Sequence, residues 1–197
     1  MNLDNKKIGF CITGSHCTLS KVIPSLEELQ QSGPEIIPVL SQSILTTNTR
    51  FGQVKKWVNK IKEITDNEIV DSIVGAEPIG PGKLLDLLII APCTGNTMAK
   101  IAAGIIDQTV VMAAKAQLRN QRPVLLAIAT NDGLGINAKN LSVLLNTENI
   151  FFVPFGQDNP VEKPNSLVAR MDLIKSSAKL ALNKKQIQPV LIEYKGI

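Results

Sequence analysis

The chain has 197 residues, 44% of them hydrophobic, and this length and composition predict one domain around one sizeable core. Lys and Arg total 21 and Asp and Glu total 17, so the formal charge is +4, and no basic block stands out. Because only 4% of the residues are aromatic as well, the composition argues against a nucleic-acid-binding surface.

The cysteines and the apolar runs indicate the compartment. Cys11, Cys17 and Cys93 are an odd number without metal-ligand spacing, so we expect free thiols and no metal site. The N-terminus lacks the order of a signal peptide, and apolar runs such as residues 87–91 fall far short of the ~20 residues that span a bilayer. We therefore expect a soluble, cytoplasmic protein that does not bind membranes.

The first forty residues predict a βαβ unit. Residues 8–13 are a short apolar run, typical of a strand buried on both faces of a parallel sheet. Apolar residues recur at intervals of three and four over residues 19–29, which predicts a helix that ends at Gly33-Pro34. Residues 36–40 then predict the second strand.

The next segment is less regular. Residues 41–52 are polar and rich in Ser and Thr, and we expect a loop that covers a site or a subunit contact. Residues 54–64 and 68–74 predict two helical pieces. Pro and Gly punctuate residues 75–82 throughout, so no regular structure is expected there.

The second half alternates strands and helices. Residues 87–91 predict the most hydrophobic strand, and the turn 92–97 leads from it into a helix. The alternation predicts an α/β fold with a Rossmann-like doubly wound parallel sheet and three layers, α/β/α. The other predicted elements are a helix at 108–118, a strand at 123–130, a helix at 137–145, a strand at 150–153, a long helix at 166–182, and a C-terminal strand or tail at 184–197.

Ligands of open parallel sheets bind beyond the carboxyl ends of the strands. Four turns qualify here, and Ser, Thr, Asn and Gly dominate them: residues 14–17, 41–43, 92–97 and 130–133. These residue types supply neutral hydrogen-bond donors and allow the backbone to approach a ligand closely. We expect the binding site to lie among these turns.

The turn after the first strand predicts an anion site. Gly14 permits close approach, and the free N–H groups of the following helix attract an anionic oxygen. The turn is not a Walker loop, because no Lys-Ser/Thr follows Gly14, and no G-x-G-x-x-G occurs in the chain. The alternative is an ordinary tight turn in which Ser15 or Thr18 caps the helix.

Titratable groups near these turns are candidates for proton transfer. His16 is the only histidine, and it is either a phosphate donor, a proton-transfer group or a solvent-facing capping residue. Cys17 is either a nucleophile or a small buried thiol. Glu77 and Asp132 offer carboxylates, but their spacing identifies no catalytic pair.

Residues 91–102 read A-P-C-T-G-N-T-M-A-K-I-A, and G-I-I-D follows at 104–107. This pattern resembles the A-P-A-T-A-N-T-x-x-K-x-A-x-G-I-x-D signature of the homo-oligomeric flavoprotein decarboxylase superfamily. The resemblance implies a Rossmann-like flavoprotein fold, a homo-oligomer and a flavin mononucleotide (FMN) cofactor. Further segments that carry it are 13–18, 72–78, 112–116, 130–132, 155–158 and 163–166.

Within that superfamily the chain is similar to subunits that act in sporulation. This similarity implies oxidation of dihydrodipicolinate, a small dicarboxylate, to pyridine-2,6-dicarboxylate. It also implies a separate partner, an A subunit that binds a pyridine nucleotide, NAD(P). The mother cell of a sporulating bacterium is then the expected location.

The resemblance also implies roles for single residues. Gly14 and Ser15 are expected to hold the flavin phosphate together with Ser41. The residues expected to face the ribityl chain or ring, and to close the pocket, are Thr94, Asn96 and Asn131 respectively.

The chain departs from the decarboxylating members in one place. They carry a catalytic histidine in the loop before the Ala-Pro motif, where this chain has Glu77-Pro78. The departure argues against an FMN-dependent decarboxylase, the third hypothesis. The first two remain open: a catalytic subunit with His16 or Glu77 as proton acceptor, or a non-catalytic binding and scaffolding subunit.

Overall fold

The computed structural model describes residues 3–193. In these residues β1 (Lys7–Ile12) lies between β2 (Glu35–Leu40) and β3 (Leu87–Cys93), and β4 (Val124–Thr130) pairs with β3. All of these pairs are parallel, and β5 (Ile150–Phe152) adds a further parallel strand beside β4. The order 2-1-3-4-5 is that of a flavodoxin-like doubly wound sheet, whose ligand site lies where the winding reverses, between β1 and β3.

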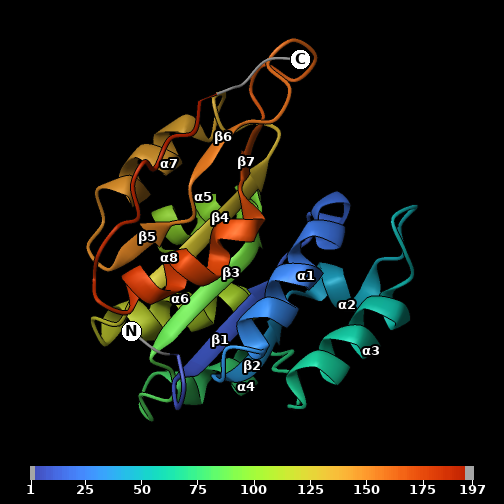
Figure 1. Ribbon diagram of the computed structural model, residues 1–197, viewed down its shortest axis with the longest axis vertical. Coiled ribbons are helices and arrows are strands. Elements are labelled where there is room, and N and C mark those ends of the chain that lie inside the picture. Colours follow the sequence, from blue (N-terminus) through green and yellow to red (C-terminus); the bar gives the residue numbers. More distant parts are fainter. Residues whose placement is uncertain (1–2, 194–197) are drawn as a thin grey trace.

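Helices cover both faces of this sheet. Helices α1 (Leu19–Gln30) and α8 (Ile174–Ala181) lie in front of the strands in Figure 1, and α6 (Thr109–Arg119) lies behind them. Helix α5 (Gly95–Ala103) packs between α6 and α7 (Ala138–Leu145). Because both faces are covered, every residue of β3 is buried, and the predicted three-layer fold is confirmed.

The outer edge of β4 is shared by two strands. β5 pairs with its first half, while β7 (Leu167–Ala169) runs antiparallel beside Ala129 and Thr130 and pairs in turn with β6 (Phe155–Gln157). The predicted helix over 166–182 is therefore wrong in its first half. Only α8, preceded by the short 3-10 helix η3 (Met171–Leu173), is helical, because residues 167–169 alternate between buried and half-buried and so pair as a strand.

Two predictions between β2 and β3 are also wrong. Residues 68–74 do not form a helix, because Val70 pairs with Val39 and satisfies backbone groups of the edge strand β2. Residues 75–82 are more regular than expected, with α4 (Ile73–Ala76) followed by η2 (Glu77–Ile79). Pro78 lies in the first turn of η2, where its missing N–H costs nothing.

The polar stretch 41–52 contains a short helix, α2 (Gln42–Thr46), which the sequence did not predict. The predicted helix at 54–64 is confirmed as α3 (Val54–Thr65). Toward the C-terminus, Leu191 forms a parallel bridge with Phe155, beside β6. The last residues of the predicted strand or tail, 194–197, lie outside the described residues.

One buried side chain joins the two strands at the centre of the sheet. Thr13, only 1% exposed, follows β1, and its Oγ1 donates to the carbonyl of Pro92 at 2.6 Å. The same oxygen accepts a hydrogen bond from the Thr94 N–H at 3.1 Å. The turn after β1 is thereby fixed against the turn after β3.

We expect Thr13→Val to lower the free energy of unfolding by about 1–3 kcal/mol, because the substitution leaves the Pro92 carbonyl and the Thr94 N–H buried without a partner. Urea denaturation measures the change. The matched control is Thr147→Val, whose hydroxyl donates to Val143 at the exposed surface and whose loss should cost less than about 0.5 kcal/mol. Equal effects of the two substitutions would contradict this role for Thr13.

Candidate functional site

The turn after β1 brings several hydroxyl groups together. The side chains of Ser15 and Thr18 are hydrogen-bonded at 2.9 Å. A Cβ atom added at Gly14 would lie 2.6 Å from Ser43 Oγ, so only glycine lets the turn pass this close to α2. Ser43 is in turn hydrogen-bonded to Ser41 at 2.9 Å. The turn therefore presents hydroxyls and the start of a helix to the same place.

His16 and Cys17 begin the 3-10 helix η1 (His16–Thr18), which leads directly into α1. The Nδ1 atom of His16 is buried and has no hydrogen-bond partner among the described residues. Partial burial lowers the pKa of His16 from its usual value, because the charged imidazolium loses hydration. The imidazole is therefore neutral near neutral pH and able to accept a proton.

The three cysteines fall into two classes. Cys17 is exposed, and its Sγ lies 3.8 Å from the hydroxyls of both Ser15 and Thr18. Cys11 and Cys93 are buried in neighbouring strands, where burial raises the pKa of Cys93 to about 12 and also raises the pKa of Cys11. These two thiols stay protonated and act as core residues.

The turn after β3 forms the second part of the site. Thr94 caps α5, since its Oγ1 accepts a hydrogen bond from the Thr97 N–H at 3.3 Å. A Cβ atom at Gly95 would lie 2.5 Å from Thr130 Oγ1, so the start of α5 packs directly against the end of β4. Asn96 is exposed on this first turn.

The turn after β4 is held by a carboxylate. Asp132 accepts hydrogen bonds from the hydroxyl of Thr130 and, at 2.7 Å, from the side-chain amide of Asn137. Asn137 accepts a further bond from Asn140 at 2.8 Å. Because its oxygens are occupied in this way, Asp132 orders the turn, while Asn131 remains exposed beside it.

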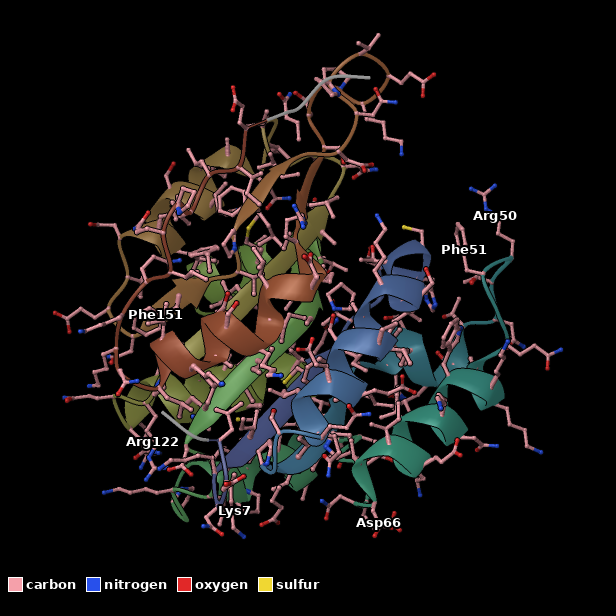
Figure 2. The ribbon with its side chains drawn as sticks, viewed as in Figure 1. Lys7, Arg50, Phe51, Asp66, Arg122 and Phe151 are labelled. Atoms are coloured by element: carbon pink, nitrogen blue, oxygen red, sulfur yellow. The ribbon has the colours of Figure 1, made fainter. Side chains whose placement is uncertain are left out.

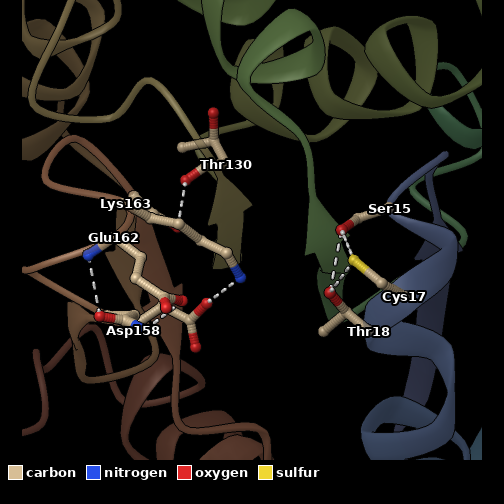
Figure 3. Close-up of polar contacts among 9 residues, drawn as sticks. Ser15, Cys17, Thr18, Thr130, Asp158, Glu162 and Lys163 are labelled. Carbon is tan, nitrogen blue, oxygen red and sulfur yellow. Dashed lines mark hydrogen bonds and ion pairs between the residues drawn. The ribbon is translucent and has the colours of Figure 1, made fainter.

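The segment between β6 and β7 closes the opposite wall. Figure 3 shows Lys163 and Asp158 facing Ser15 and Cys17 from across the site. Lys163 Nζ and Asp158 Oδ2 form an ion pair at 3.2 Å. Ser166 Oγ donates to the carbonyl of Thr130 at 3.3 Å, which fixes this segment to the end of β4.

These elements enclose a cleft of about 920 Å³ at the carboxyl ends of β1, β3 and β4. The volume is in the range of small-molecule and cofactor sites. Six of the predicted site residues line it: Gly14, Ser15, His16, Thr94, Asn96 and Asn131.

The other two predicted residues lie elsewhere. Ser41 does not line the cleft, but it holds Ser43, which touches the Gly14 turn. Glu77 is exposed in η2, in a segment that runs along α6 toward the amino end of β3, where Asn120 bonds to Gly80 at 2.7 Å. The single chain therefore does not bring Glu77 to the cleft.

The sequence analysis missed several lining residues. The cations Lys21, Arg50 and Lys163 and the aromatic Phe51 all line the cleft. Figure 2 shows Arg50 and Phe51 together at the outer end of the segment between α2 and α3. The available signal was Gly52, a common residue in the last position of a tight turn.

The chemistry of the cleft fits the flavin mononucleotide implied by the resemblance. Hydroxyls and a helix start suit a phosphate, and the buried, unpartnered Nδ1 of His16 is a polar atom that a ligand can satisfy. Phe51, Ala129 and Val168 supply apolar surface for a planar ring. Within residues 3–193, no three His, Cys, Asp or Glu side chains are grouped so that they could hold a metal ion.

A search of the described helices for membrane spans gave none of sufficient length and apolar character.

Comparisons with known proteins give consistent results. Over 196 residues the chain is 53% identical to the B subunit of dipicolinate synthase of Bacillus subtilis (strain 168), an alignment that covers 99% of this chain and 98% of that protein. The crystal structure of the corresponding dipicolinate synthase polypeptide, also the B subunit, from Bacillus halodurans matches with a TM-score of 0.90 and 51% identity, over 98% of this chain and 99% of that chain.

A more distant structure shows the shared fold. Burkholderia xenovorans DmrB, solved in complex with FMN as a cubic protein cage, matches with a TM-score of 0.62 at 20% identity, over 75% of this chain and 87% of that chain. The profile of the Flavoprotein family matches residues 1–180. The chain belongs to the Flavoprotein family.

Proposed function

We propose that this chain is the B subunit of a dipicolinate synthase, which acts with a separate A subunit to oxidise dihydrodipicolinate to pyridine-2,6-dicarboxylate. The observation that carries the proposal is 53% identity to the Bacillus subtilis protein over nearly the full length of both chains. The expected setting is the mother-cell cytoplasm of a sporulating bacterium. NAD(P) is expected to bind to the A subunit.

The reaction asks little bond-making chemistry of the protein. Loss of a hydride and a proton makes the ring aromatic, which favours the product strongly. The protein must therefore mainly hold the dicarboxylate against the hydride acceptor and remove the proton. FMN, when bound, supplies a hydride acceptor within this chain.

The turn after β1 is the proposed phosphate-binding part. Ser15 and Gly14 face the phosphate, and Ser43 approaches them closely. Ser41 acts through its hydrogen bond to Ser43. The groups proposed to face the ribityl chain and the ring are Thr94, Asn96 and Asn131.

His16 is the proposed proton acceptor. Its lowered pKa keeps the imidazole neutral, and its Nδ1 has no partner among the described residues. The carboxylates that line the same cleft are engaged, since Asp132 accepts from Thr130 and Asn137 and Asp158 pairs with Lys163. Glu77 can reach a cleft only where two copies of the chain meet.

A non-catalytic binding and scaffolding subunit is the second candidate. The observation that favours it is the same engagement of Asp132 and Asp158, which leaves His16 as the one proton acceptor of this kind within the described cleft. In this case the cleft binds substrate or flavin, and the chemistry takes place on the A subunit.

The deciding experiment is a reconstitution. Dihydrodipicolinate oxidation is assayed with the A subunit alone, this chain alone and both together, each with and without FMN. Activity only in the mixture supports the proposed function, and a requirement for FMN with a flavin spectrum supports a catalytic subunit. Full activity of the A subunit alone would contradict the proposal.

For a catalytic His16, we expect His16→Asn to reduce turnover of the reconstituted pair by about 100-fold, a typical contribution of general base catalysis. Because its pKa lies below the usual value, the wild-type rate should fall only as pH drops through that lowered pKa, where the imidazole gains a proton. The variant should lose this acid limb. Cys17→Ser, on the same turn, is the control, and an unchanged rate and pH profile in His16→Asn would favour the scaffolding subunit.

Gly14→Ala tests the phosphate site. The added methyl would lie 2.6 Å from Ser43 Oγ and force that hydroxyl away from the turn. A cost of this kind, about 1–3 kcal/mol, corresponds to FMN binding about tenfold weaker or more. Fluorescence titration with FMN measures the affinity. Gly80→Ala, whose added methyl meets nothing closer than 3.5 Å, should bind FMN like the wild type.

We also propose that the chain forms a homo-oligomer, as its superfamily does. Light scattering coupled to size exclusion should give a mass that is a multiple of the single chain at micromolar concentration. A monomer under these conditions would contradict this proposal and would leave Glu77 without access to a cleft.

A further inference from the structure

Residues 50–51 form the tip of a rigid β-turn at the mouth of the cleft. Thr49 and Gly52 exchange two backbone hydrogen bonds, at 3.2 and 3.1 Å. The N–H of Phe51 also donates to Thr49 Oγ1 at 3.2 Å. Gly52 has a φ of 143°, and an added Cβ would lie 2.5 Å from Trp57 Nε1, so the turn is fixed on α3. The backbone of this 50–51 tip is therefore ordered before any ligand arrives.

The two side chains of the tip are open to a ligand. Phe51 is 44% exposed although it is a large apolar residue, and it lines the cleft. The guanidinium of Arg50 lies 4.9 Å from the centre of the Phe51 ring. Arg50 makes no ion pair with any residue from 3 to 193. A guanidinium beside an aromatic face recognises planar carboxylates well, because it offers several donors in one plane.

The other charges of the cleft leave a positive surplus. Lys163 is paired with Asp158, and Asp132 is held by Thr130 and Asn137. Among the cations that line the cleft in the described chain, Lys21 and Arg50 have no carboxylate partner. Two unpaired cations match the two negative charges of a dicarboxylate.

We infer that the 50–51 tip determines specificity for the substrate: Arg50 binds one carboxylate of a planar, six-membered-ring dicarboxylate, and Phe51 packs against the ring. Lys21 provides the second positive charge of the same cleft. This inference rests on the proposed function, because it takes the cleft as the place where the dicarboxylate binds. It adds the residues that separate a ring dicarboxylate from a flexible one.

The chain carries its own reporter of this binding event. Trp57 is the only tryptophan, and it packs directly against Gly52 at the base of the turn. Occupation of the 50–51 tip should therefore change the tryptophan fluorescence of the protein. The signal requires neither the A subunit nor turnover.

The test is a fluorescence titration of the purified full-length chain with pyridine-2,6-dicarboxylate in metal-free buffer. Heptanedioate, a flexible dicarboxylate, and pyridine, a ring without carboxylates, are titrated in parallel. We expect pyridine-2,6-dicarboxylate to bind at least about tenfold more tightly than either, since it alone satisfies both Arg50 and Phe51. Equal affinity for heptanedioate would overturn the inference.

Four variants locate the effect. Arg50→Gln and Phe51→Leu should each weaken binding about tenfold, whereas Arg50→Lys should retain part of the affinity because it keeps the charge but not the planar fork. Lys56→Gln is the matched control, since Lys56 lies 5.9 Å from the Trp57 ring but does not line the cleft. Its affinity should stay that of the wild type. Thermal melts and the sizing column check that all variants fold and assemble alike.

The reconstituted assay separates this inference from the proposed function. With the A subunit, Arg50→Gln should raise KM about tenfold and change kcat less than about threefold, because a binding contact away from the proton acceptor is lost. If the wild-type pair does not oxidise dihydrodipicolinate, the proposed function fails, whatever the titration shows. If the wild-type pair is active and the tip variants keep their KM and affinity, the inference fails alone. A loss of oligomeric state in these variants would also overturn it, by making the tip a contact between copies.

Discussion

The buried hydroxyl of Thr13 is the interaction on which the site depends. It donates to the Pro92 carbonyl and accepts from the Thr94 N–H, so it connects β1 to the end of β3 at the point where the sheet reverses its winding. Parallel strands bring their carboxyl ends to one edge, but they do not by themselves fix one turn against another. This pair of hydrogen bonds does so for the turns at Gly14 and Thr94, which form two walls of the cleft.

The polar groups around the cleft serve two different purposes. Some satisfy one another and stabilise the turns, as in the Asp132 network and the Lys163–Asp158 pair. Others have no internal partner, among them the Nδ1 of His16 and the guanidinium of Arg50. An unpaired buried donor or acceptor is costly, so a site retains such groups where a ligand completes them. This contrast supports the assignment of proton transfer and substrate binding to the second set.

The wall that faces the β1 turn was the hardest part to predict. Residues 167–169 form a strand of three residues, too short for a periodic pattern, and the apolar stripe of α8 extends the helical pattern back over them. Pairing with Ala129 and Thr130 decides their conformation, and it brings Lys163 and Ser166 to the cleft. The 50–51 tip escaped prediction for a similar reason, because its two side chains gain meaning only from the turns they face.

The sequence by itself determined the fold class, most of the strands, and six of the eight predicted site residues as neighbours, because buried parallel strands and the turns that follow them have strong local signatures. Only the tertiary structure decided that Glu77 lies outside the cleft, that Ser41 acts through Ser43, and that Lys21, Arg50 and Lys163 converge. These facts depend on contacts between residues far apart in the chain, and no local pattern of apolar and polar residues encodes them.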